Sequence, residues 1–483
     1  MASTTFPAEA RPGILAPALP FLVAGAVYVL LLLAGDKLLN DADTWWHIAS
    51  GNWILANGFP HADPFSFTFA GKPLIAKEWL SQVAYAEAFR IAGWTGVVVL
   101  AAAAIALAFG LLTHALRASL TGLPAVAMVA VAFMLVAPHA TARPHALALP
   151  LLVAWAAGLA RAADRQKAPP YALLLLMVAW ANLHAGFTFG ILLVGAFGLD
   201  AIVAAPSAGR RRLAIAWVRF GLLTVVAACI TPYGPQSMLL TAKVLGLGPA
   251  LSVIGEWRPA DFATVGPLEL ALVAGIGFAL WRGVTLPPVR ILILLGLVHM
   301  ALSADRNAEL MGLVGPLVVA GPLARQFPLL RAGQSAPSFI GGAVLAVLAV
   351  PVTALLTFLV PYQPSPANAP TAALAALKGT NAAHILNDYN FGGYLIAAGT
   401  PTFIDGRTEL FGADFLLRYT RDMQLEDIPD LLKLLDDQKI DATLLMPSTP
   451  ANAFLDRDPG WKRLYGDDTA VVHVRLPLRG SLN

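Results

Sequence analysis

Long apolar runs recur along the first three quarters of the chain and are separated by short polar segments. A run of about 18–22 apolar residues suits one α-helical crossing of a hydrocarbon core roughly 30 Å thick. The pattern predicts a multi-span α-helical membrane protein with about eleven transmembrane helices. The predicted spans, of which the fifth is short and joins the sixth tightly, are 15–35, 94–114, 122–138, 145–162, 170–183, 185–205, 212–231, 266–282, 287–304, 307–323 and 339–360.

The apolar runs end at the proline-rich segment 361–366, whose prolines favour an extended linker. Beyond this linker charged residues become frequent and the apolar runs shrink to the length of strands. We therefore expect a transmembrane body at 1–361, which includes a first external loop at 36–93. A second, small external domain is expected at 362–483.

Strands and helices are both predicted in this C-terminal domain. Three short apolar segments are expected to be strands: 401–405, 442–446 and 470–474. Between the first two, apolar residues recur at helical spacing and predict an amphipathic helix; they are Ile428, Leu431, Leu432 and Leu435. The C-terminal domain is thus expected to be α/β.

Composition supports the membrane assignment and limits the possible partners. The 483 residues are 58% hydrophobic and 13% charged, and the mean hydropathy is +0.69. Soluble domains contain about 25% charged residues. The net charge is only +3, and no basic block interleaves with aromatic residues. Membrane lipids are therefore expected partners, and nucleic acid is not.

The orientation follows from the lysines and arginines, which favour cytoplasmic loops. If the N-terminus is cytoplasmic, one side of the predicted membrane receives Arg11, Arg117, Arg161, Arg165, Lys167, Arg210, Arg211, Arg212, Arg282, Arg290, Arg325 and Arg331. An odd number of spans then places the C-terminal domain outside. The sequence predicts a multi-pass protein of the cell inner membrane with an extracytoplasmic C-terminal domain.

Polar residues that a bilayer tolerates poorly gather at the predicted outer ends of the spans. Ionisable groups at such depth usually face a water-filled cavity and mark function, although each alone also suits a helix cap or an interfacial anchor. The set comprises Asp41, Asp43, His47, His139, Arg143, His145, Asn182, His184, Tyr233, Gln236, Glu256, Arg258, Glu269, His299, Asp305, Arg306, Asn307 and Glu309.

The first external loop carries the densest polar motif, from Asp41 to Gly51. Two carboxylates separated by one residue, here Asp41 and Asp43, can hold a divalent ion, or one of them can act as a general base. The alternative is that Asp43 caps the helix that the following residues predict. Two aromatic residues, Trp45 and Trp46, follow the pair and suit either sugar stacking or an interfacial belt.

This loop resembles the first external loop of the GT-C superfamily of membrane glycosyltransferases. These enzymes use polyprenyl-phosphate sugar donors and include protein O-mannosyltransferases, lipid A aminoarabinose transferases and oligosaccharyltransferase catalytic subunits. The segment Asp43-Thr44-Trp45-Trp46-His47 looks like their acidic motif with its essential carboxylate, and Lys77-Glu78-Trp79-Leu80 is similar to the segment before their second span. Ala42 stands where a paired acid would be needed, so a divalent metal ion stays an open possibility.

The resemblance implies a GT-C-type glycosyltransferase that moves a sugar from a polyprenyl-phosphate donor to a lipid or glycan acceptor of the cell envelope. Asp43, with Asp41 as second candidate, is the expected catalytic carboxylate. The donor phosphate needs cations, for which the candidates are Arg143, Arg306, His139 and His145; the alternative for the arginines is pairing with Glu256 or Asp305. Further site candidates are His47, Lys77, Glu78, His184 and Glu256.

Two other classes of protein remain open at this point. A transporter or flippase of lipid-linked saccharide would place polar groups near mid-bilayer, often in internal repeats, and neither feature is visible here. A non-catalytic envelope assembly protein would not need the loop carboxylates. In the C-terminal domain, the turn-forming stretches 387–394 and 404–407 are expected to hold the fold more than to bind a ligand.

Overall fold

The computed structural model describes residues 18–246, 248, 255–332 and 339–476, and a helix lies on every predicted span. Arg11 and the first three residues of the first predicted span lie outside the described residues. The span helices are α1 (Leu19–Leu33), α4 (Trp79–Arg117), α5 (Gly122–Val136), α6 (Pro144–Asp164), α7 (Leu173–Leu183), α8 (Phe187–Ala204), α9 (Ser207–Ala228), α11 (Pro267–Arg282), α12 (Pro288–Ser303), α13 (Ala308–Gln326) and α14 (Phe339–Leu359).

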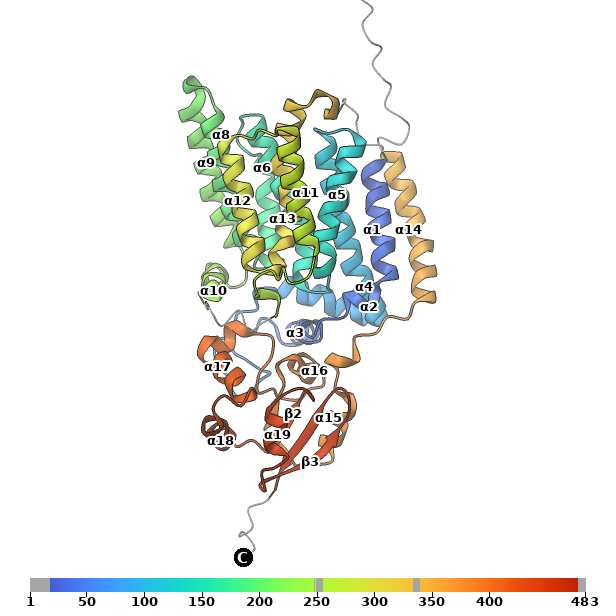
Figure 1. Cartoon of the computed structure of the whole chain (residues 1–483), viewed down its shortest axis with the longest axis vertical. Helices are drawn as coiled ribbons and strands as arrows, with labels where there is room; N and C mark the ends of the chain where they lie inside the picture. Colours follow the sequence, from blue (N-terminus) through green and yellow to red (C-terminus); the bar gives the residue numbers. More distant parts are fainter. Residues whose placement is uncertain (1–17, 247, 249–254, 333–338, 477–483) are drawn as a thin grey trace, which may run out of the picture.

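These helices stand side by side in one bundle, as Figure 1 shows. Among the described residues, five helical segments are both long and apolar enough to cross a membrane: 79–117, 122–139, 144–164, 187–204 and 305–326. The protein is therefore a multi-span helical membrane protein. The number of eleven crossings stays a prediction, because several of the other helices are shorter.

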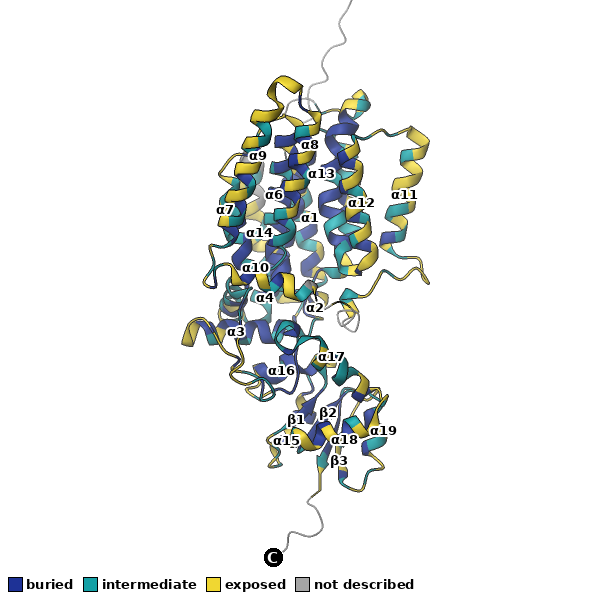
Figure 2. Ribbon diagram, turned by 90° about the vertical axis from the view of Figure 1, so that its left-hand side faces the viewer, coloured by how far each residue is buried: buried dark blue, intermediate teal, exposed yellow. Residues whose placement is uncertain are grey.

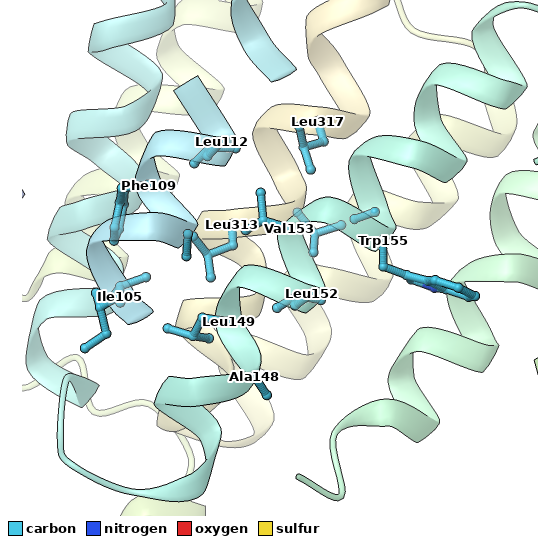
Figure 3. Packing of buried hydrophobic residues seen from close by; sticks show 14 of the residues in the cluster. Ile105, Phe109, Leu112, Ala148, Leu149, Leu152, Val153, Trp155, Leu313 and Leu317 are labelled. Carbon is cyan, nitrogen blue, oxygen red and sulfur yellow. The ribbon is translucent and has the colours of Figure 1, made fainter. Parts of the chain in front are cut away.

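Helix α4 organises the bundle, since α1, α5, α6 and α13 all pack against it. Alanines along α4, such as Ala101 and Ala102, are fully buried and allow neighbouring helices to approach closely. Larger side chains fill the spaces that remain, among them Phe109 of α4, Leu149 of α6 and Leu313 of α13 (Figure 3). By contrast, α11 lies at the edge of the bundle, where Leu268 clusters with Leu135 of α5, and most of its residues are exposed (Figure 2), as expected for a helix that faces lipid.

The helix α4 begins at Trp79, fifteen residues before the predicted span. Its first part belongs to the external loop, and the helical path breaks at Ala92 and Gly93. Gly93 has φ of 58° and ψ of −145°, a conformation that residues with a side chain rarely adopt. The glycine thus marks the place where the loop portion turns into the bundle.

Arg290 was counted among the cationic residues on the predicted cytoplasmic side, and the structure shows that its charge is paired. It lies within α12 and is 1% exposed. Its guanidinium contacts Asp200 Oδ2 at 2.7 Å and Asp164 Oδ1 at 3.0 Å, and it donates to the carbonyl of Val318 at 2.8 Å. This arginine joins α6, α8, α12 and α13 and is not a free loop charge that reports orientation.

Short elements cover the end of the bundle that faces the C-terminal domain (Figure 1). Helix α3 lies across this end and packs against the first part of α4. These elements, with the short turns elsewhere in the body, are α2 (Gly35–Leu38), α3 (Asp43–Asn57), η1 (Ala137–His139), α10 (Gln236–Leu245), η3 (Gly255–Trp257), η4 (Asp305–Asn307) and η5 (Pro328–Leu330).

The C-terminal domain is α/β, as predicted, but its strands differ from the prediction. Its described elements are η6 (Pro366–Asn368), α15 (Thr371–Lys378), β1 (Ile385–Asn387), η7 (Tyr389–Phe391), α16 (Gly392–Ala397), α17 (Thr408–Met423), α18 (Ile428–Asp437), β2 (Ala442–Leu445), α19 (Ala451–Leu455), β3 (Trp461–Gly466) and β4 (Val471–Arg475). The strand order is β1-β2-β4-β3, with β1 parallel to β2 and the other pairs antiparallel.

The segment 401–405 was predicted to be a strand, and this is wrong. Thr402 makes an isolated bridge to Ser66 of the first external loop, and the amide of Phe403 donates to the side chain of Asn387 at 2.8 Å. These partners replace a sheet neighbour. The predicted helix at 428–435 is confirmed as α18, and the strands at 442–446 and 470–474 correspond to β2 and β4.

The C-terminal domain is tied to the first loop by a buried ion cluster. Arg407 contacts both oxygens of Asp405 at 2.7 Å and also contacts Asp63 of the loop. All three side chains are at most 3% exposed. Close backbone contact supports this docking, because a Cβ at Gly393 would lie 2.2 Å from the carbonyl oxygen of Ala42.

We expect Arg407→Met to destabilise the docked domain strongly. The change keeps apolar volume but leaves Asp63 and Asp405 buried without their cation, which costs about 3–5 kcal/mol. The melting temperature of the purified protein in detergent measures this loss. Arg457→Met, at an exposed residue on α19's C-terminal side, is the matched control and should change stability by less than about 0.5 kcal/mol. Equal melting of both variants would contradict the structural role of the cluster.

Candidate active site

A cavity of about 520 Å³ lies where the bundle, the first loop and the C-terminal domain meet. Ten of the eighteen polar residues that the sequence placed at the outer ends of separate spans line it. Of the predicted site residues, those that line the cavity are Asp41, Asp43, His47, Lys77, Glu78, Arg143, His145, His184, Glu256 and Arg306. His139 is not among its lining residues.

Arg143 is the centre of this cavity's charge network. Its guanidinium lies 2.6 Å from Asp43 Oδ2, 3.3 Å from Asp41 Oδ2 and 2.8 Å from Glu256 Oε2. The residue precedes Pro144, the first residue of α6, and has extended backbone angles, as the position before a proline requires. The hydroxyl of Tyr85 donates to its carbonyl at 3.0 Å, which fixes the backbone to α4.

Arg306 joins the network through the same glutamate. Its Nη1 lies 2.8 Å from Glu256 Oε1, so one carboxylate bridges two guanidinium groups. The Arg306 guanidinium also lies 4.9 Å from the ring centre of Trp257, a cation–π contact. The alternative that both arginines pair with Glu256 is therefore seen in the structure, and both residues also line the cavity.

Burial and neighbouring charges give the carboxylates of this network different pKa values. Burial raises the pKa of Asp43 to about 7 against the opposing effect of Arg143, and the charges of Asp41 and Glu256 add to the rise. Burial also acts to raise the pKa of Glu256, but Arg143 and Arg306 outweigh it and lower this pKa to about 2. Near neutral pH, Glu256 is a fixed anion and Asp43 can exchange a proton.

The structure corrects the alternative of Asp43 as a helix cap. Asp43 is the first residue of α3, and its side chain caps no backbone amide of that helix. Instead Asp41 Oδ1 accepts the amide of Asp43 at 2.9 Å. The capping function belongs to Asp41, which leaves the Asp43 carboxylate directed at Arg143.

A second group of ionisable residues lies on the neighbouring wall. Lys77 Nζ is 2.9 Å from Glu409 Oε1 of the C-terminal domain, and burial raises the pKa of Glu78. His184 Nε2 lies 3.5 Å from Glu78 Oε1. The burial of His47, together with the nearby cation Arg143, lowers its pKa well below the usual range. His47 is therefore neutral at physiological pH and is not a phosphate-binding cation.

The two remaining histidine candidates are linked to each other. His145 Nε2 lies 3.1 Å from the carbonyl oxygen of His139 and 3.9 Å from Glu309 Oε2. His139 Nε2 lies 3.9 Å from Asp305 Oδ2, at the rim. His139 therefore orients His145 through its backbone and does not reach the cavity with its own ring.

Toward the bundle the cavity becomes apolar. Its inner wall is made by residues of α6, α8, α12 and α13: Ala148, Leu149, Leu152, Phe189, Leu192, Met300 and Leu310. Leu192 is 69% exposed, so this end of the cavity reaches the lipid-facing surface of α8. The site thus has a charged centre with an apolar branch.

The C-terminal domain contributes a wall that the sequence did not assign to the site. Asn368, Tyr389, Asn390, Thr408 and Glu409 line the cavity. The stretches 387–394 and 404–407 do hold the fold, through Asn387 and Arg407, but Tyr389, Asn390 and Gly406 also reach the cavity. Their density of polar turn residues was the available signal.

A divalent metal ion was left open, with Asp41 and Asp43 as its ligands. Both carboxylates are paired with Arg143. Within the described part of the chain, no group of three or more His, Cys, Asp or Glu side chains is placed to hold a metal ion. The arrangement of these side chains does not fit a metal site, and the reaction proposed below uses none.

No protein-family model and no curated protein matches the chain. Its fold, however, is similar to that of two solved structures, an oligosaccharyltransferase and ArnT. The archaeal oligosaccharyltransferase AglB from Archaeoglobus fulgidus, solved with an inhibitory peptide and a dolichol-phosphate, matches with a TM-score of 0.56 and 13% identity. The match covers 87% of this chain and 69% of AglB.

A second similar structure is ArnT from Cupriavidus metallidurans, bound to undecaprenyl phosphate. Its TM-score is 0.50 at 13% identity, and the match covers 96% of this chain and 99% of ArnT. At these identities the comparison establishes the fold and leaves the residues of the site to be argued from their own geometry.

The raised pKa of Asp43 predicts a specific pH dependence of stability. A buried acid whose pKa lies above its usual value of about 3.9 contributes stability below that value and loses it as the pH rises through 7. Asp43→Asn removes this titration. We expect the melting temperature of the wild type, relative to that of Asp43→Asn, to fall between pH 5 and pH 8.

The substitution also removes the contact with Arg143, which shifts the melting temperature by a constant amount. The test is therefore how the difference in melting temperature between the two proteins changes with pH. A difference between the two proteins that stays constant from pH 5 to pH 8 would show that Asp43 is ionised throughout this range.

Proposed function

We propose that this chain is an integral-membrane glycosyltransferase that transfers a sugar from a polyprenyl-phosphate donor to a lipid or glycan acceptor of the cell envelope. The observation that carries the proposal is one cavity in which Asp43, two arginines and an apolar branch meet on a GT-C fold. The similarity to ArnT bound to undecaprenyl phosphate and to AglB with dolichol-phosphate supports the class of donor.

Arg143 and Arg306 are the proposed ligands of the donor phosphate. A guanidinium group matches phosphate oxygens with two parallel hydrogen bonds, and Glu256 holds the two arginines at a fixed separation. The apolar branch, lined by Leu149, Leu152 and Leu192, suits the prenyl chain next to the phosphate. The positive charges also offset the charge that grows on the leaving phosphate.

Asp43 is the proposed general base. An acceptor hydroxyl gives its proton to the Asp43 carboxylate while its oxygen forms a bond to the anomeric carbon of the sugar. The bond between that carbon and the phosphate oxygen breaks, and the polyprenyl phosphate leaves with the electron pair. A pKa of about 7 for Asp43 suits this proton transfer near neutral pH.

The position of the cavity favours this enzyme over a transporter. Alternating access would place the polar site near the middle of the bundle, whereas the middle of this bundle is packed with apolar side chains (Figure 3). The charged residues meet at the end of the bundle, against the C-terminal domain. Reaction at one membrane face therefore explains their placement better.

Asp43→Asn is the sharpest test of the proposed chemistry. Asparagine keeps the shape of the side chain but cannot take a proton, so transfer should fall by about 10²–10⁴-fold. Binding of undecaprenyl phosphate to the purified variant should change little. Transfer is measured in membranes supplied with a radiolabelled polyprenyl-phosphate sugar pool.

Asp41→Asn is the matched control, because asparagine still accepts the amide of Asp43 through its side-chain oxygen. Full activity in Asp43→Asn with loss of activity in Asp41→Asn would identify Asp41 as the general base. Full activity in both variants would contradict the mechanism.

The proposed orientation places the cavity and the C-terminal domain on the extracytoplasmic side of the cell inner membrane. A fusion of alkaline phosphatase after Ser365, in the linker, should therefore be active. A fusion of green fluorescent protein after Lys167, in the exposed turn between α6 and α7, should fluoresce. A cytoplasmic signal at Ser365 would remove the orientation and with it the proposed location of the reaction.

A further inference from the structure

If the proposed function is correct, the cavity fixes the orientation in which a polyprenyl-phosphate sugar binds. Such a donor is linear, with the phosphate between the lipid and the sugar. Once the arginines fix the phosphate and the apolar branch takes the lipid, the sugar has to lie on the opposite side of the arginines. The following inference rests on the proposed function and concerns that opposite side.

The order of the residues along the helices defines the two sides. Arg143 immediately precedes α6, whereas Leu152 lies nine residues further along the chain, or roughly 13 Å deeper in the bundle at 1.5 Å per residue. Arg306 precedes α13 in the same way, with Leu310 one turn inside. The arginines therefore stand at the end of the bundle, between the apolar branch and the C-terminal domain.

The wall beyond the arginines is built by the C-terminal domain. Tyr389 is half-buried, and its hydroxyl lies 3.3 Å from Thr408 Oγ1. Burial raises the pKa of Tyr389, and the carboxylate of Asp43 adds to the rise, so the phenol stays protonated and can donate a hydrogen bond. Asn390 follows with an exposed side chain on the same cavity. Hydroxyl and amide groups of this kind are suitable partners for the hydroxyl groups of a sugar.

The turn that carries these groups is held rigidly. The amide of Tyr389 donates to the hydroxyl of Tyr419 at 3.2 Å, and the Asp388 carboxylate accepts the amide of Asn390 at 3.0 Å. Neither bond involves the side chains that face the cavity. These two bonds are made by backbone amides and remain when either side chain is changed, while the Asn390 side chain makes a further hydrogen bond to Asp388.

The C-terminal domain also touches the proposed base directly. A Cβ at position 406 would lie 2.0 Å from Asp43 Oδ1, so the glycine allows the domain's backbone to lie against this carboxylate. The wall's charged residue, Glu409, is paired with Lys77 at 2.9 Å. The groups left for a ligand on this wall are mainly neutral.

We infer that the C-terminal domain forms the subsite for the donor sugar, with Tyr389, Asn390 and Thr408 binding its hydroxyl groups. The domain then selects the sugar, the arginines bind the phosphate and the bundle accommodates the lipid. An acceptor-binding function of this wall is the competing possibility, and the experiment below separates the two.

The test compares a donor with and without its sugar. The full-length protein in nanodiscs is loaded with radiolabelled undecaprenyl phosphate. This label is then displaced either by unlabelled undecaprenyl phosphate or by polyprenyl-phosphate sugars extracted from the membranes of the organism that makes the protein. The wild type should bind the sugar-bearing lipids more tightly. Tyr389→Phe and Asn390→Ala should each weaken that binding by about three- to tenfold, the effect of one lost hydrogen bond, and leave bare undecaprenyl phosphate within about twofold.

Two controls separate the sugar subsite from the phosphate site and from the fold. Tyr465→Phe removes a tyrosine hydroxyl that bonds Asp467 at 2.8 Å away from the cavity, and it should change neither affinity. Arg143→Lys should weaken both lipids, because a point charge replaces the guanidinium fork.

Three outcomes would overturn the inference. The wild type could bind both lipids equally, or the Tyr389 and Asn390 variants could weaken both lipids equally, which would indicate a structural function. These variants could also leave both affinities unchanged and lower only transfer, which would assign the wall to the acceptor. Failure of the wild type to bind bare undecaprenyl phosphate would instead contradict the proposed function itself.

Discussion

Arg143 places one guanidinium group among three carboxylates that come from two distant parts of the chain, Asp41 and Asp43 at the start of α3 and Glu256 in η3. Each of these anions would be costly to bury without its cation. The network therefore requires the start of α6, the first loop and the turn before α11 to lie together, which defines the end of the bundle. The position of the cavity follows from this arrangement, whereas the raised pKa of Asp43 comes first from its burial and is opposed by Arg143.

Charges in the body of the protein are concentrated at the two ends of the bundle. At the end far from the C-terminal domain, Arg290 joins Asp164 and Asp200, and at the near end Arg143 and Arg306 share Glu256. The packed middle is apolar (Figure 3). The Arg290 cluster is closed, since Arg290 is 1% exposed, whereas the cluster of Arg143, Arg306 and Glu256 lines a cavity. Of these two clusters, the one that lines the cavity is accessible to a ligand.

The sequence predicted the helices well because hydrophobicity over one span is a local property. Each span ends at one of only two membrane faces, so the sequence also predicted that polar residues at the outer ends of the spans gather on the same face. It failed where tertiary contacts decide. Phe403 bonds the side chain of Asn387 instead of a strand, and the side chain of Asp43 contacts the distant Arg143 instead of capping its own helix, the alternative left open. The contribution of Tyr389 to the cavity depends on how the C-terminal domain docks, which no local pattern encodes.

The docked C-terminal domain supplies one wall of the cavity. The proposed reaction needs a low dielectric for strong charge interactions, yet a lipid or glycan acceptor must still be able to enter the cavity. The C-terminal domain meets both needs, because Gly393 and Gly406 allow its backbone to lie against Ala42 and Asp43 while Arg407 fixes it to the first loop. Water is displaced from one side of Asp43 by protein backbone. The C-terminal domain therefore contributes to the burial that raises the pKa of this carboxylate.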